Sequence, residues 1–185
     1  NPFCELRIAK VFIDENIPFP ELLAGIDYIG DAIDYVPGKI ALIEYAYQQQ
    51  IPIIAAMGAG RRLDPSKLMI ADIAKTYGCP LAKNIRKRLR ERGIYSGVKV
   101  VFSTEPPLPT EGDELGSMAF VPAVAGMMMA AQIVRDIRNQ FLLERIQLGK
   151  LLCRIVQRSS KLGRFPKIPA LKIYIVVSKC QFFCL

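Results

Sequence analysis

Two aspartates stand at the end of a short apolar run. Residues 28–33 have the composition of a buried strand. Asp31 lies near the end of this run, and Asp34 follows it directly. In an open α/β sheet, ligands bind at the carboxyl ends of the strands. Carboxylates there could hold Mg²⁺ against phosphate oxygens, because Mg²⁺ takes one or two carboxylates together with water and substrate oxygens. Asp34 could equally be the N-cap of a following helix, so the spacing alone leaves both interpretations open.

The next apolar run, residues 52–57, ends at Gly58-Ala59-Gly60. Such a turn could bring backbone N–H groups close to a ligand, or could be only a tight turn. The sequence contains no GxGxxG and no GxxxxGK[ST], the usual phosphate-binding loops. Cys79 precedes Pro80 at the start of a predicted helix, where the helix end favours a thiolate, but a structural role is equally compatible.

Histidine is absent from the sequence, which excludes Ser/His/Asp and Cys/His nucleophile systems and imidazole metal ligands. The five cysteines form no CxxC pair, and no signal-peptide pattern precedes them. We therefore expect a cytoplasmic protein whose chemistry rests on carboxylates, Lys, Arg, Cys or backbone groups.

The elements that must position these residues alternate between strand and helix. A helical pattern at residues 38–50 separates the apolar runs at 28–33 and 52–57, which predicts a βαβ unit with parallel strands. Further strands are expected at 6–12, 67–73 and 99–103, and helices at 20–24 and 80–92. The sequence therefore predicts an α/β fold, a Rossmann-like, mostly parallel sheet flanked by helices.

The predicted helix at 80–92 has one apolar stripe and one basic face. Four cations fall within about 100° of each other opposite the stripe: Lys83, Arg86, Lys87 and Arg90. This face is either a solvated outer surface or a surface that contacts nucleic-acid phosphates. No aromatic residue lies between the cations, so the sequence does not indicate base stacking.

The net charge of +8 is unevenly distributed. Residues 1–137 hold 15 Lys and Arg against 16 Asp and Glu, whereas residues 138–185 hold 10 against one. We therefore expect a near-neutral body at 1–137 and a basic, apolar tail at 138–185. Residues 115–134 carry no charge and are long enough to span a membrane, but Pro122 and Gln132 favour a strand-to-helix segment in a soluble core.

A series of short motifs runs in order through residues 1–137. They are Asp31-Ala32-Ile33-Asp34 before Lys39, Gly58-Ala59-Gly60, Leu63-Asp64-Pro65, Ala71-Asp72-Ile73, Cys79-Pro80-Leu81-Ala82, Val101-Phe102-Ser103-Thr104-Glu105 and Phe120-Val121-Pro122. Together they resemble the bacterial tRNA threonylcarbamoyladenosine dehydratases, a family in the ThiF/MoeB/HesA group related to ubiquitin-activating enzymes.

The resemblance implies an ATP-dependent enzyme that activates the threonylcarbamoyl group on the tRNA adenosine beside the anticodon and cyclises it. It implies that Asp34 is a catalytic residue that approaches the ATP phosphates and Mg²⁺, with Asp31, Lys39 and Gly58 in the nucleotide site. It also implies tRNA as a partner, for which the basic helix face is the expected surface. A homodimer and a sulfur-transfer or cysteine-desulfurase-type partner are expected by family analogy, and a membrane partner is not.

The family's glycine-rich ATP loop and ribose-binding acidic residue do not occur in this sequence. We therefore expect a chain that is truncated at its N-terminus and exposes an apolar sheet edge, and the sequence leaves open whether it binds ATP or is active alone. The sequence also fits a non-enzymatic binding or dimerisation module, or another ThiF-like adenylyltransferase.

Overall fold

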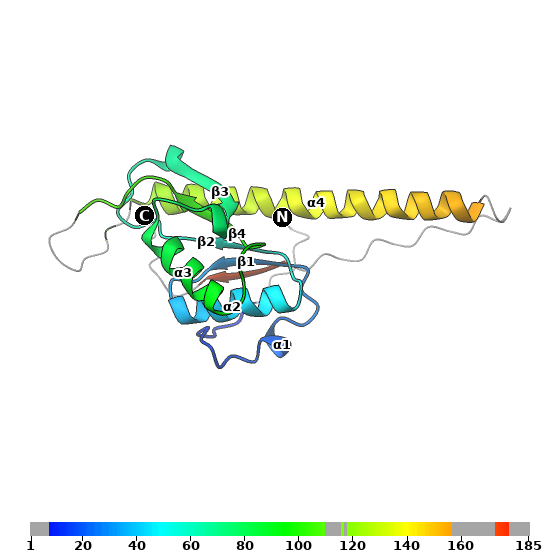
Figure 1. The fold of residues 1–185 in the computed structure, drawn as a ribbon, viewed down its shortest axis with the longest axis horizontal. Coiled ribbons are helices and arrows are strands. Elements are labelled where there is room, and N and C mark those ends of the chain that lie inside the picture. Colours follow the sequence, from blue (N-terminus) through cyan, green and yellow to red (C-terminus); the bar gives the residue numbers. More distant parts are fainter. Residues whose placement is uncertain (1–7, 110–115, 117, 157–172, 178–185) are drawn as a thin grey trace.

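The computed structural model describes residues 8–109, 116, 118–156 and 173–177. A five-stranded sheet has the strand order β3-β4-β2-β1-β5 (Figure 1). Four neighbouring strands run parallel: β4 (Lys99–Ser103), β2 (Ile53–Ala56), β1 (Tyr28–Ala32) and β5 (Ile173–Val177). The edge strand β3 (Leu68–Asp72) pairs with β4 in the antiparallel direction. The predicted α/β fold with a mostly parallel sheet is therefore confirmed.

Helices cover both faces of this sheet (Figure 1). The chain forms α1 (Phe19–Leu22), α2 (Val36–Gln48), the short 3₁₀ turns η1 (Pro65–Lys67) and η2 (Ile73–Lys75), α3 (Pro80–Glu91) and α4 (Phe120–Val156). Because successive strand residues point to opposite faces, Ile29 and Val100 pack in the core under α2 and α3. Their neighbours Tyr28 and Val101 pack in the core under α4. The result is a three-layer arrangement.

The start of α2 differs from one of the two sequence interpretations. The N-cap residue is Tyr35, and no described side chain caps this helix end. The interpretation of Asp34 as the N-cap is therefore wrong, because Pro37 fixes a helical φ in the first turn and the helix starts at Val36. Gly38 is required for packing, since a Cβ there would lie 2.1 Å from the carbonyl oxygen of Ile13.

The uncharged segment forms a helix that packs on the sheet. Val121, Ala125, Met129 and Ile133 recur every fourth residue and are buried against it. By length and composition alone, Phe120–Leu143 could cross a membrane, and the buried stripe packs one face of this helix on the sheet. The expected strand is not formed at the described residues 116, 118 and 119. Helix α4 starts at Phe120 because Pro122 is tolerated in a first turn.

The strand predicted at residues 6–12 is also wrong over its described part, residues 8–12. Within the described residues 8–12 the chain forms no strand and these residues are exposed, and residues 6 and 7 lie outside the described ranges. The free edge of β1 is instead taken by β5, which pairs with β1 from Tyr28 to Ala32. The expected exposed sheet edge beside β1 is therefore covered. The division of the chain at residue 137 stays a prediction, and α4 crosses that residue without a break.

Candidate functional site

The carboxyl ends of β1, β2 and β4 lie at one edge of the sheet, because the three strands are parallel neighbours. Asp34 follows the end of β1, Gly58 follows β2, and Glu105 follows β4. The topology therefore brings Asp34 and Gly58 to the same edge, as the sequence predicts. Their role in binding a nucleotide stays a prediction.

Asp31 and Lys39 lie just inside this edge and contact each other. The Lys39 ammonium donates to Asp31 Oδ2 at 2.7 Å and to the Ala56 carbonyl at 2.9 Å, while the Ile33 N–H donates to Asp31 Oδ1 at 2.8 Å. Both side chains are 0% exposed. Burial raises the pKa of Asp31, opposed by the charge and hydrogen bond of Lys39 and by the Ile33 amide. This pair fastens α2 to β1 and β2.

The two aspartates that the sequence places together therefore occupy different surroundings. Asp31 is completely buried and its two oxygens already accept hydrogen bonds. Asp34, three residues later, is exposed. Of the two, only the Asp34 side chain lies where solvent or a ligand can reach it directly.

Gly58 lies against the first turn of α3. A Cβ on Gly58 would meet Leu81 Cβ at 3.6 Å and Cys79 Sγ at 3.9 Å, which are ordinary contact distances. Neighbouring atoms therefore do not demand glycine here. Cys79 is the N-cap residue of α3 and is 4% exposed within the main core, which favours its structural interpretation.

One residue at this edge was missed by the sequence analysis. Arg62, in the loop after β2, is 2% exposed, and its Nε and Nη1 have no hydrogen-bond partner among the described residues. The same loop is fixed by Glu105, whose Oε2 accepts the N–H groups of Leu63 at 3.1 Å and Asp64 at 3.0 Å. A buried cation with unsatisfied donors favours an anionic partner. The only sequence signal is an Arg-Arg pair after a glycine turn.

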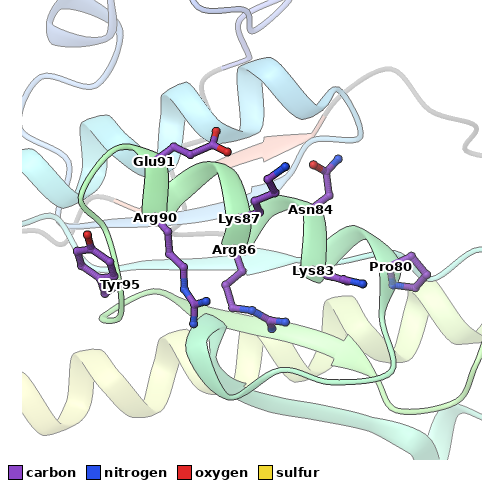
Figure 2. A pocket seen from close by; sticks show the side chains of 8 residues that line it. All are labelled: Pro80, Lys83, Asn84, Arg86, Lys87, Arg90, Glu91 and Tyr95. Atoms are coloured by element: carbon purple, nitrogen blue, oxygen red, sulfur yellow. The ribbon is translucent and has the colours of Figure 1, made fainter.

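The basic face of α3 borders a shallow cleft of about 740 Å³. Its lining includes all four predicted cations and an aromatic side chain, as Figure 2 shows: Pro80, Lys83, Asn84, Arg86, Lys87, Arg90, Glu91 and Tyr95. Arg86 differs from the other three, because its Nη1 donates to the Thr76 carbonyl at 2.8 Å and to the Thr76 hydroxyl. Arg86 therefore ties α3 to η2 and is only partly exposed.

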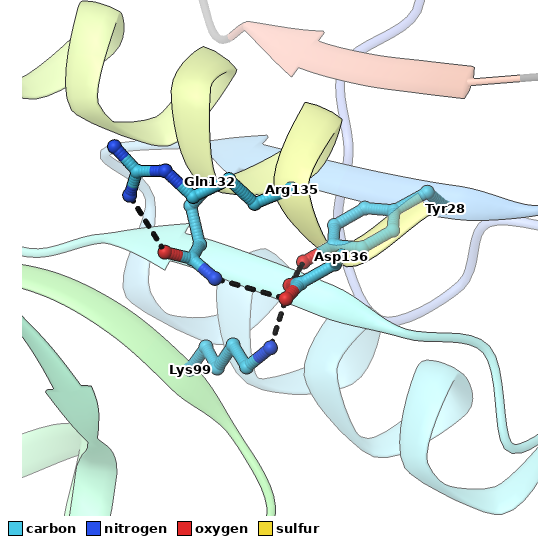
Figure 3. Close-up of polar contacts among 5 residues, drawn as sticks. All are labelled: Tyr28, Lys99, Gln132, Arg135 and Asp136. Carbon is cyan, nitrogen blue, oxygen red and sulfur yellow. Dashed lines mark hydrogen bonds and ion pairs between the residues drawn. The ribbon is translucent and has the colours of Figure 1, made fainter. Parts of the chain in front are cut away.

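A second polar cluster lies at the opposite, amino edge of the sheet (Figure 3). Asp136 of α4 accepts hydrogen bonds from the Tyr28 hydroxyl at 2.7 Å, Lys99 Nζ at 2.6 Å and Gln132 Nε2 at 2.9 Å. Partial burial raises the pKa of Asp136, but these hydrogen bonds outweigh it and lower the pKa. Burial, followed by the Asp136 hydrogen bond and charge, raises the pKa of Tyr28 well above its usual range. The cluster clamps α4 to the sheet, away from the candidate site.

Comparisons with known proteins show the family of the chain. The sequence model of the ThiF family matches residues 1–169, beyond residue 137, where we placed the end of the resemblance. The tRNA threonylcarbamoyladenosine dehydratase of Bacillus subtilis is 37% identical over 164 residues, which cover 80% of this chain and 65% of that protein. The Escherichia coli protein of the same name is 34% identical over 132 residues, covering 68% of this chain and 48% of the relative.

Solved structures show the same likeness. Crystal structures of the Escherichia coli dehydratase in complex with AMP and with ATP each match with a TM-score of 0.69 and 30% identity, over 77% of this chain and 60% of theirs. The chain thus spans less than two thirds of the length of these relatives. Because the family match covers most of the chain and the fold agrees, the chain belongs to the ThiF family.

Proposed function

We propose that this chain acts as an ATP-dependent tRNA dehydratase. It would bind ATP at the carboxyl edge of β1, β2 and β4, activate the carboxylate of a threonylcarbamoyl group on the adenosine beside the anticodon, and close that group to a ring. One observation carries the proposal: an exposed carboxylate, Asp34, stands at the ligand edge of a parallel sheet. Relatives with this fold are solved with AMP and ATP.

The residues present fit a magnesium ion that is shared with a nucleotide. Within the described ranges, no group of three or more His, Cys, Asp or Glu could hold a metal by itself. Mg²⁺ needs only one or two carboxylates when phosphate oxygens and water complete its shell, so Asp34 suffices. Bound there, Mg²⁺ would neutralise phosphate charge during carboxylate activation.

Asp31 and Lys39 act in this proposal as positioning residues. Asp31 Oδ1 accepts the N–H of Ile33, the residue directly before Asp34, and Lys39 holds the other oxygen of Asp31. The buried pair therefore sets the backbone from which Asp34 projects. Arg62 is 2% exposed, so the loop after β2 would have to open for phosphate or carboxylate oxygens to reach its Nε and Nη1 donors.

Calorimetric titration of the full chain with MgATP tests the proposal. We expect binding, and we expect Asp34→Ala to weaken it by at least about tenfold, since a charge-assisted contact is lost. Asp27→Ala is the matched control, because Asp27 precedes β1 at the amino edge of the sheet. Wild-type chain that releases no heat would favour the non-enzymatic module.

Conversion of threonylcarbamoyladenosine in tRNA to its cyclic form, followed by mass spectrometry of digested nucleosides, tests the reaction itself. A tRNA substrate would place the chain in the cytoplasm. Family resemblance also predicts a homodimer and a sulfur-transfer partner, and light scattering of the purified chain tests the first of these.

A further inference from the structure

An aromatic side chain stands beside the cations of α3, although none lies between them in the sequence. Tyr95 lies in the loop after α3 and is 65% exposed. Its neighbour Ile94 is 3% exposed and donates its N–H to the Leu89 carbonyl at 2.9 Å, which anchors the loop. Gly93 allows the reversal there with a φ of 78°. The buried Ile94 thus leaves the next side chain, Tyr95, in solvent beside Arg90 (Figure 2).

The cations of the cleft divide into two kinds. Arg86 donates a hydrogen bond to the Thr76 carbonyl. Three further cations, Lys83, Lys87 and Arg90, are exposed along the cleft. At 1.5 Å rise per residue these three charges extend over about 10 Å. Fixed cations in a row suit the phosphates of one nucleic-acid strand.

The cleft also leads toward the proposed nucleotide site. Pro80 lines its far end, and the adjoining Leu81 packs against Gly58 at the carboxyl edge of the sheet. A strand lying along α3 would therefore run from Tyr95 toward the edge that carries Asp34.

We propose that this cleft binds an unpaired stretch of RNA, in which Tyr95 stacks on one base while Lys83, Lys87 and Arg90 contact phosphates. An exposed aromatic ring stacks on a base face that no neighbouring base covers, so RNA that is paired along its length would use the cations alone except at its ends. The choice of RNA as the polyanion rests on the proposed function. The stacking partner and the preference for unpaired RNA go beyond it.

Fluorescence anisotropy with the full chain tests the inference on two probes: an RNA stem-loop with an unpaired loop, and a blunt RNA duplex of the same base composition. We expect Tyr95→Ala to weaken stem-loop binding by about tenfold and to leave duplex binding unchanged, because stacking on a base is lost. Tyr95→Phe keeps the ring and should bind like wild type. Tyr47→Ala, on α2, is the matched control for loss of a partly exposed tyrosine.

The cations provide a second arm. Lys87→Gln should weaken binding of both RNA probes. On unpaired RNA it should also reduce the slope of log affinity against log salt by about 0.7, the share of one phosphate contact. Tyr95→Ala with unchanged stem-loop affinity, or with equal losses on both probes, overturns the stacking assignment while tRNA binding stands. A wild-type chain that binds neither probe overturns the RNA part of the proposed function as well.

Discussion

The Lys39 ammonium and the Asp31 carboxylate lie 2.7 Å apart with both side chains fully buried. The pair joins three elements, because Lys39 sits on α2, Asp31 on β1, and the Ala56 carbonyl that Lys39 also reaches ends β2. A buried ion pair adds little net stability compared with apolar side chains, but losing one partner leaves an unpaired charge in the core. Removing one partner should therefore lower the free energy of unfolding by more than the intact pair adds to it.

Lys39→Met should lower the free energy of unfolding by about 3–5 kcal/mol, since Asp31 loses its buried partner. The double variant Asp31→Leu, Lys39→Met should recover much of that loss, because no charge then remains. Urea unfolding followed by circular dichroism measures both. A single variant that unfolds at the wild-type urea concentration would show that the pair is not buried in solution.

Arg62→Met separates a structural role from an anion-binding role for the buried guanidinium. Removing a buried cation with unsatisfied donors should leave the unfolding temperature unchanged or raise it. The same change should weaken MgATP binding by at least about tenfold if the guanidinium meets an anion. Thermal unfolding and calorimetry on the same preparation report the two effects. A sharp loss of stability with full ATP affinity would contradict the assignment.

Arg86 and Lys87 are neighbours on α3 with different expected roles. Arg86→Ala should lower the free energy of unfolding by about 1.5–3 kcal/mol, because Thr76 loses charge-assisted hydrogen bonds. Lys87→Ala should leave stability nearly unchanged and reduce RNA affinity. Chemical unfolding and anisotropy, applied to both variants, make the comparison. Equal stability of the two variants would count against the link between α3 and η2.

Acid stability should depend on Asp136. Its pKa is lower in the folded chain than in the unfolded chain, so folding favours the ionised form. The stabilisation is present above the unfolded pKa, near 3.9, and is lost as the pH falls through the lower folded pKa. Asp136→Asn should therefore flatten the fall in unfolding temperature below about pH 4.

Thermal unfolding across the acid range measures this effect, with Glu21→Gln, an exposed carboxylate of α1, as the control. Tyr28→Phe removes one donor to Asp136 and should flatten the curve partially. If Asp136→Asn and Glu21→Gln gave the same curve, the cluster would contribute nothing to acid stability.

The sequence predicted the elements whose signals are local. The strand at residues 99–103 and the helix that begins at Pro80 were found with their bounds or close to them, because apolar runs and a first-turn proline mark them. The βαβ unit followed from the helix between two apolar runs. Its bounds differ by one or two residues, since β1 ends at Ala32, α2 spans Val36–Gln48 and β2 spans Ile53–Ala56.

What the sequence could not provide depends on contacts between distant residues. The burial of Arg62 requires the loop that Glu105 holds, 41 residues from Asp64. Arg86 can donate to Thr76 only when η2 and α3 pack together. Tyr95 lies beside the cleft because the chain turns at Gly93. Of the strand predicted at residues 6–12, the described residues 8–12 form none, and the edge of β1 is paired by β5, a segment distant in sequence.

Pairing of β1 with β5 has a consequence for the order in which the chain folds. Tyr28 pairs with Ile173, so this ladder joins segments separated by most of the chain, whereas β1 and β2 are joined by a single helix. During synthesis, β1, β2 and β4 can assemble long before residue 173 leaves the ribosome. Throughout that interval no other described strand pairs with this edge of β1, so its backbone donors and acceptors can pair with a neighbouring nascent chain, and a faster passage through residues 138–177 would favour correct folding.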